Sequence, residues 1–423
     1  MKRFVLTMSA MAMVAGVYAQ ETISLQGCYE LALQHTPLSG QAALYRELAA
    51  SKEERLGLAY RPQVSLNGQW SYQSDVFSLP FSIPGAETPE IPKSQYQATL
   101  GIEQSIYDGG MVRQSREASK RELVANQQKV EVDLYKVKES VNSLYFGILR
   151  IQEAEKNLEA ARNTLLERKK VIDAGFSTGV LLQSDKSAFE KEILSIEQQL
   201  VAAEAEKEGL VAMLADKIGQ PLSVDAVLTL PGGTIPLEGE ATINRPELSY
   251  LSEQKTVLSQ AGELIAARTK PKVSAFARGG FGSPNPYNFF KTDLSGFYMA
   301  GVRLYWPLFD WGASKQERQE LQIQEQLLEN SRSDAMSQFE NGTLQWRKKW
   351  LASDEVMKRD AEIVRLQESI VREYAARLEG GTVTSSDYIT ALDQLTRAKI
   401  TARMHEIDKA WYQVQYFTLT GNL

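Results

Sequence analysis

Residues that could carry chemistry are few in this chain of 423 residues. His35 and His405 are its only histidines and Cys28 is its only cysteine, and the sequence groups none of them with metal-ligand spacing. The glycines of "PGG" at 231–233 lack the strand, helix and Lys that a phosphate-binding loop requires. We therefore expect no catalytic residue, no metal and no cofactor, and a protein that is not an enzyme.

An Asp close to Gly recurs instead, in "QSIYDGG" at 104–110 and "WPLFDWG" at 306–312. An alternating segment precedes each motif, and a long pattern of polar and apolar residues follows it. Asp accepts hydrogen bonds from the free N–H groups that begin a helix, and Gly lets the chain bend there. The pattern predicts two strand-to-helix junctions, formed by Asp108, Gly109, Gly110, Asp310 and Gly312.

Further motifs recur at matching distances. "RPQVSLNG" at Arg61 and "KPKVSAFA" at Lys270 are 209 residues apart, whereas "FSTGVLLQSD" at 176–185 and "LEGGTVTSSD" at 378–387 are 202 apart. Loss of seven residues from one hairpin loop accounts for the change. The sequence therefore predicts an internal duplication, with a first repeat at 20–219, a linker at 220–245 and a second repeat at 246–423.

Each predicted repeat contains the same elements. A helix, at about 24–59 or 246–269, comes first and is followed by a β-hairpin, because polar and apolar residues alternate with a period of two. A helical hairpin comes last, because apolar residues recur every seven positions, as in coiled coils. The predicted β-hairpins cover 63–107 and 272–309, and the predicted helical hairpins cover 110–219 and 312–420.

Four strands per chain are too few to close a barrel. Their alternation over about ten residues suits membrane-spanning strands, and a sheet in lipid must close on itself. Three chains supply twelve strands, which is enough for a water-filled lumen. We thus expect a mainly α protein with a transmembrane β-barrel shared by several chains.

The amino terminus has the features of an exported protein. Lys2 and Arg3 precede an apolar run that ends in "VYA", so residues 1–19 are predicted to be a signal peptide rather than a membrane anchor. Removal of the signal changes the net charge from −6 to −8. This acidic balance argues against a nucleic-acid partner.

With these repeats, junctions and turns, the chain resembles the TolC family of outer-membrane efflux channels over nearly its whole mature length. The resemblance implies a homotrimer, a twelve-stranded barrel in outer-membrane lipid and a long periplasmic α-helical barrel. It places the protein in the outer membrane of a Gram-negative bacterium. The implied partners are a periplasmic adaptor (membrane fusion) protein and an inner-membrane pump of the ABC or RND type, which supply solutes that the channel passes outward.

The same resemblance assigns roles to residues near the two helical turns. It implies that the adaptor docks on the turn residues Gly179, Val180, Leu181, Gly381, Thr382 and Val383. It implies a periplasmic constriction at Asp387, for which the sequence equally supports a helix N-cap. This chain departs from the family pattern at Thr390, where a second Asp is expected, at Val383 in place of a basic residue, and at Leu378 in place of Tyr.

Two other functions fit parts of the pattern. A periplasmic or secreted coiled-coil scaffold without a pore would keep the helices, but it would not need alternation with terminal aromatics on four strands. A free-standing porin would keep the strands, but it has only short periplasmic turns. An outer-membrane channel-tunnel of an efflux or secretion system accounts for both.

Overall fold

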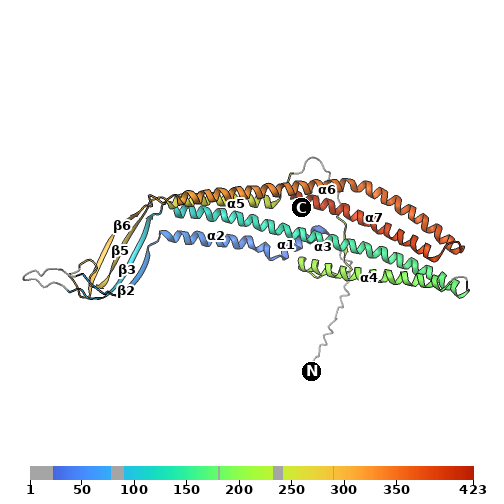
Figure 1. Cartoon of the computed structure of the whole chain (residues 1–423), viewed down its shortest axis with the longest axis horizontal. Coiled ribbons are helices and arrows are strands. Elements are labelled where there is room, and N and C mark those ends of the chain that lie inside the picture. Colours follow the sequence, from blue (N-terminus) through green and yellow to red (C-terminus); the bar gives the residue numbers. More distant parts are fainter. Residues whose placement is uncertain (1–21, 78–89, 180–181, 232–241, 289) are drawn as a thin grey trace, which may run out of the picture. The chain divides into compact units, whose positions relative to one another are not determined.

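The computed structural model describes residues 22–77, 90–179, 182–231, 242–288 and 290–423 (Figure 1). The predicted signal peptide at 1–19, together with Val180 and Leu181, lies outside the described residues. The chain divides into two compact units, and each takes segments from both predicted repeats. We call residues 40–132 and 246–336 the sheet unit, and residues 1–39, 133–245 and 337–423 the hairpin unit.

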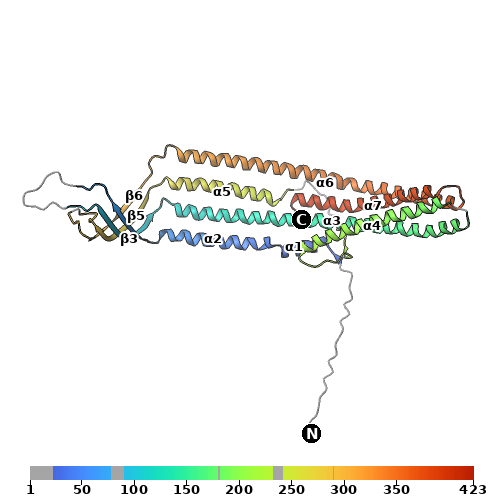
Figure 2. The same cartoon turned by 60° about the horizontal axis from the view of Figure 1, so that its bottom comes forward.

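The sheet unit contains one antiparallel four-stranded sheet, in the order β2-β3-β5-β6 (Figure 1), of which Figure 2 labels β3, β5 and β6. Its helices are α2, α5 and the first parts of α3 and α6, and a 3-10 turn, η2, lies between α2 and β2. The bounds are α2 (Gln41–Gly57), η2 (Leu58–Tyr60), β2 (Gln63–Tyr72), β3 (Ser94–Tyr107), α3 (Met111–Ser177), α5 (Pro246–Arg268), β5 (Lys272–Ser283), β6 (Ser295–Tyr305) and α6 (Ala313–Glu379).

The strand register gathers the alternating apolar residues on one face of the sheet. Leu66 is opposite Leu100, Leu100 is opposite Gly279, and Gly279 is opposite Tyr298. Directly opposed residues in antiparallel strands point to the same side. This face is uncovered in the single chain, with Leu66 78% exposed and Tyr298 87% exposed. The other face carries mainly polar residues, such as Gln97 opposite Gln69.

The hairpin unit consists mainly of two helical hairpins. Helix α3 turns into α4 (Gln183–Ile218), and α6 turns into α7 (Ser385–Thr420); α3 and α6 have 67 residues each, and α4 and α7 have 36 each. One buried cluster centres on Tyr145, Phe146 and Leu214. Across the described ranges, no helix combines the length and apolar character needed to cross a membrane.

A short parallel strand pair and a first helix complete the hairpin unit. The strands are β1 (Thr22–Ile23) and β4 (Val227–Leu228), and the helix is α1 (Leu25–His35), whose N-cap Ser24 accepts from the backbone N–H of Gly27. Strand β4 lies within the predicted linker at 220–245, which therefore contains secondary structure.

The prediction of one continuous helix over about 24–59 was wrong. Helix α1 ends at His35, and a 3-10 turn, η1 (Pro37–Gly40), separates it from α2. Thr36 is extended, with ψ of 132°. Proline disfavours the helical conformation in the residue before it, so Pro37 ends the first helix.

Candidate functional site

The two strand-to-helix junctions have the same hydrogen-bonding pattern. The Asp108 carboxylate accepts from the backbone N–H groups of Gly110 and Val112, at 2.8 and 2.6 Å. Asp310 accepts from Gly312 and Ser314, both at 3.0 Å. Each Asp thus uses one oxygen for the bend and the other for the first turn of the helix.

These contacts favour the ionised form of both carboxylates. Partial burial alone would raise the pKa of Asp108, but the N–H groups of Val112 and Gly110 lower it overall. For Asp310, the hydroxyl and N–H of Ser314 lower the pKa. Both junctions therefore carry a fixed negative charge at neutral pH.

The two helical turns are built around glycines in the left-handed conformation. Gly179 has φ of 75° and Gly381 has φ of 67°, and their N–H groups donate to Phe176 and Leu378, each at 3.0 Å. Among the described residues, and apart from each glycine's own chain neighbours, no heavy atom lies within 4 Å of where a Cβ would stand on either glycine. Both turns therefore present bare backbone to the surroundings, which is the geometry that a docking partner could approach closely.

Thr382 and Val383, assigned to the second turn, and Thr390, assigned with Asp387 to the periplasmic constriction, lie in three different environments. Thr382 donates from its N–H and its hydroxyl to the carbonyl of Arg377, at 2.9 and 3.1 Å. Val383 packs against the buried cluster formed by Leu378, Tyr388 and their neighbours. Thr390 is exposed, and its hydroxyl donates to the Ser386 carbonyl at 2.8 Å. Thr382 alone of these three belongs to the exposed end of the turn.

Asp387 forms a capping box with Thr384. The Thr384 N–H and hydroxyl donate to Asp387 Oδ2 at 2.9 and 2.7 Å, while the Asp387 N–H donates to the Thr384 hydroxyl oxygen at 3.2 Å. These contacts with Thr384 lower the pKa of Asp387. The side chain is thus held as an exposed anion at the start of α7.

A contact between the two hairpins lies next to the turns. Arg168 on α3 donates to Glu379 Oε1 on α6 at 2.6 Å, and its guanidinium lies 5.4 Å from the ring centre of Tyr388 on α7. The Glu379 carboxylate raises the pKa of Arg168. Phe189 on α4 stacks on Tyr388 with ring centres 6.2 Å apart. An open groove of about 780 Å³ borders this contact.

Sequence reasoning missed Arg168, Glu379 and Tyr388, because no short motif joins them. The resemblance implies a tyrosine at position 378 and a basic residue at position 383, and this chain has Leu and Val there. The structure instead places a tyrosine at the start of α7 and a basic residue on the opposite hairpin. The only signal in the sequence was that Leu378 and Val383 stand where the resemblance implies a tyrosine and a basic residue.

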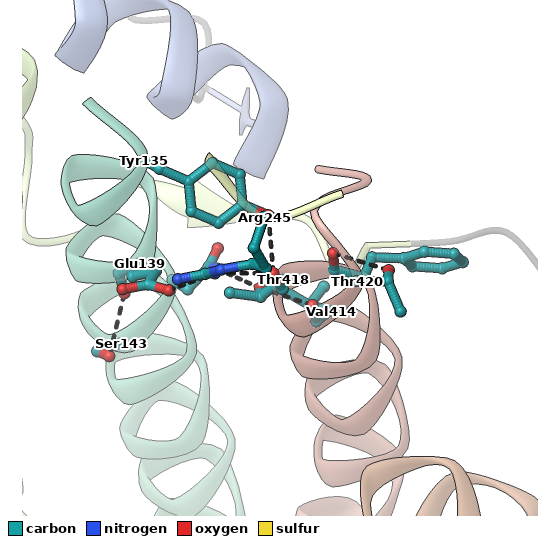
Figure 3. A network of polar contacts seen from close by, with 9 residues as sticks. Tyr135, Glu139, Ser143, Arg245, Val414, Thr418 and Thr420 are labelled. Carbon is teal, nitrogen blue, oxygen red and sulfur yellow. Dashed lines mark hydrogen bonds and ion pairs between the residues drawn. The ribbon is translucent and has the colours of Figure 1, made fainter. Parts of the chain in front are cut away.

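A second polar network surrounds Arg245, which is only 4% exposed (Figure 3). Its guanidinium donates to Glu139 Oε1 at 2.8 Å and to the Thr418 carbonyl at 2.9 Å. It also lies between two aromatic rings, 4.4 Å from the centre of Tyr135 and 4.8 Å from that of Phe339. One side chain therefore joins the segment before α5 to α3, α6 and α7.

The described residues contain no group of three His, Cys, Asp or Glu side chains placed to hold a metal ion. The contacts described above cap helices or join hairpins. Their geometry is suited to building and positioning turns.

Residues 28–219 match the family model described as outer membrane efflux protein. No curated protein gives a significant match to the sequence. Among solved structures, the outer membrane protein VceC of Vibrio cholerae has 17% identity and a TM-score of 0.70, covering 94% of this chain and 96% of its own. The Campylobacter jejuni CmeC outer membrane channel has 17% identity and a TM-score of 0.69, covering 94% and 85%.

The Neisseria gonorrhoeae MtrE outer membrane channel, solved in its open state, gives a similar result. It has 17% identity and a TM-score of 0.67, and the match covers 94% of this chain and 88% of that channel. At 17% identity, TM-scores of 0.67 to 0.70 show that the fold is shared. The mainly helical chain with a four-stranded sheet has the fold of these outer-membrane channels.

Proposed function

We propose that this protein, whose residues 28–219 match the model of the outer membrane efflux protein family, is the outer-membrane channel-tunnel of an efflux system. It conducts solutes passively out of the cell, from a periplasmic adaptor and an inner-membrane pump of the ABC or RND type. The observation that carries the proposal is a sheet with one exposed apolar face, joined to long helical hairpins.

Lipid is the environment that such a face requires. In water, exposing residues such as Leu66 and Tyr298 would cost about 25 cal/mol for each Å² of apolar surface. Strands β2 and β6 are the sheet edges, and their unpaired backbone groups must find partners within the membrane. Pairing β6 of one copy with β2 of the next satisfies both, and three copies form a twelve-stranded barrel around a polar lumen.

Internal duplication provides the matching helical hairpins of the tunnel. The equal lengths of α3 and α6, and of α4 and α7, support it. So do the paired Asp junctions and the paired glycine turns. A trimer then presents six similar hairpins to the periplasm.

A test of this function combines fractionation with conductance. The mature protein is expected in the outer-membrane fraction, to need detergent for extraction, to have the mass of a trimer, and to conduct ions in a planar bilayer. A soluble monomer without channel activity would instead support the coiled-coil scaffold.

Adaptor docking is assigned to the hairpin turns, and Gly381→Val tests the assignment. A β-branched residue is strained at a φ of 67°, so the turn must change shape. We expect efflux of a transported dye to fall at least fivefold in cells, with the trimer content of the outer membrane unchanged. Gly380→Ala is the matched control, because its Cβ would meet neighbours only at ordinary distances of 3.6 and 3.7 Å. Normal efflux in Gly381→Val would remove the assignment.

Three copies of Asp387 near the trimer axis would form the periplasmic constriction. Asp387→Ala is expected to lower the divalent-cation block of single channels at least threefold at neutral pH, because three negative charges are lost from the ring. Thr384 lowers the pKa of Asp387, so each carboxylate that forms the ring is ionised at neutral pH. Asp393→Ala, one to two turns later on α7 and paired with Arg397, is the control. An unchanged block would leave Asp387 with its capping role alone.

The contact that holds the tunnel closed in this chain is then the pairing of Arg168 with Glu379 and Tyr388. The contact replaces the basic residue and the tyrosine that the resemblance leads one to expect at positions 383 and 378. Its position beside the second turn supports a role in holding the hairpins together in the closed state.

A further inference from the structure

The second strand-to-helix junction differs from the first by an exposed aromatic cluster. Aligning the two motifs on their Asp residues places Trp306 opposite Gln104 and Trp311 opposite Gly109. Phe309 and Trp311 are 71% and 90% exposed, with their ring centres 4.8 Å apart. Leu308, directly before Phe309, is also exposed. A surface of this kind on a single chain indicates something that covers it.

Trp311 holds a backbone conformation that favours glycine. Its φ is 56°, and it is the one non-glycine residue with positive φ in the part of the chain that the structure describes. The equivalent Gly109 has φ of 74°. A left-handed conformation is strained for tryptophan, because its Cβ lies too close to the following carbonyl oxygen. The strain is expected to be offset by an interaction of the exposed ring.

Two cations line a groove together with Trp306, the first aromatic residue of this junction. An open groove of about 710 Å³ runs from Trp306 and Leu308 to Lys315 and Arg318 on α6. Within the described residues, no carboxylate pairs with Lys315 or Arg318, whereas nearby Arg268 pairs with Glu317 at 3.1 Å. Asp310 also lines the groove, but its carboxylate accepts from Gly312 and Ser314. The groove therefore offers the apolar side chains of Trp306 and Leu308 together with two cations that no carboxylate of the described residues pairs.

We infer that residues 306–318 bind the headgroup of an acidic phospholipid, with the aromatic rings in the interfacial region of the bilayer and Lys315 and Arg318 on the phosphate. This inference rests on the proposed function, which puts the sheet in a membrane. The junction begins just after β6 ends, at the depth where tryptophan and basic side chains favour the lipid interface. Cations beside anionic headgroups are attracted to them electrostatically.

A second copy of the chain is the competing occupant. Because β6 is an edge strand, a neighbouring copy would bring the start of its β2 close to the junction. That segment carries the exposed Arg61 two residues before β2. A further cation would repel Lys315 and Arg318, so the charges favour an anionic lipid.

Bromolipid quenching tests the inference on the full-length trimer in nanodiscs. The lipid is phosphatidylcholine containing an equal mole fraction of either brominated phosphatidylcholine or brominated phosphatidylglycerol, with bromine near the headgroup end of the chains. We expect wild-type tryptophan emission to be quenched at least twice as strongly by the acidic lipid. In K315Q/R318Q this preference should disappear while quenching by brominated phosphatidylcholine remains.

Trp311→Gly restores the residue of the first junction and relieves the strain, so it should fold. It is expected to lower the quenched fraction of emission clearly, whereas Trp346→Phe, a change at the ring that stacks on Tyr412, should not. Unchanged quenching in Trp311→Gly, or an unchanged lipid preference in K315Q/R318Q, would overturn the inference and indicate that a second copy covers the junction. A wild-type protein that does not enter nanodiscs would refute the proposed function itself.

Discussion

Replacing Gly280 with Ala is expected to lower the amount of assembled trimer in the outer membrane at least tenfold. Gly280 lies on β5 opposite Thr99 of β3, in the middle of the sheet. A Cβ on Gly280 would stand 2.0 Å from the Ala98 carbonyl oxygen and 2.9 Å from the Thr99 Cα. Both are backbone atoms, so the strands must move apart and lose hydrogen bonds that lipid cannot replace.

Gly279→Ala is a closely matched control, because it makes the same chemical change one residue earlier. Its Cβ would meet nothing closer than the Phe297 carbonyl oxygen at 3.7 Å. Outer-membrane fractions of both variants can be compared by native electrophoresis and immunoblotting. Equal trimer levels in the two variants would mean that the pairing of β3 with β5 tolerates a side chain at position 280.

Arg245→Ala is expected to destabilise the hairpin unit by about 3 kcal/mol, the lower end of the range for breaking a buried ion pair. The lower end applies because the partner Glu139 keeps about a third of its side chain exposed, at 35%. The change also removes a donor to the Thr418 carbonyl and the cation between Tyr135 and Phe339. Thermal unfolding of the detergent-solubilised protein, followed by circular dichroism, should begin at a temperature lower by about 6 °C or more.

Two variants distinguish the Arg245 network from a general loss of charge. Arg359→Ala removes an exposed pairing with Glu355 on α6 and should change stability by less than about 0.5 kcal/mol. Arg245→Lys keeps the charge but cannot form the same planar contacts with two rings. It should recover only part of the stability. If Arg245→Ala unfolds like Arg359→Ala, the network contributes little.

Local sequence patterns predicted the elements that are governed by local physics. Period-two alternation identified the four strands, and their apolar residues share one face because pairing in register preserves that alternation. The Asp-Gly pairs identified where the helices begin after the sheet. Pro37 favours a break, but the helical pattern continues on both sides of it. The pattern therefore predicts one helix, although α1 and α2 are separate.

Contacts between distant segments could not be predicted from one sequence. Arg168 and Glu379 are 211 residues apart, and Arg245 and Glu139 are 106 apart. Coiled-coil periodicity determines which face of a helix is buried, but it does not specify which residue of another hairpin lies opposite. Arg245 is the last residue of the predicted linker, and nothing in its local sequence indicates burial beside two aromatic rings.

The equal lengths of the paired helices limit how this chain can change over time. The stack of Phe189 on Tyr388 joins the two hairpins near their turns. Deleting one heptad from α3 and its partner heptad from α4 would retract that end by about 10 Å, because each helical residue rises 1.5 Å. The opposite hairpin would then project alone. Inherited insertions and deletions should therefore be found as matched changes in both halves of the gene, so that the two helical hairpins keep equal lengths.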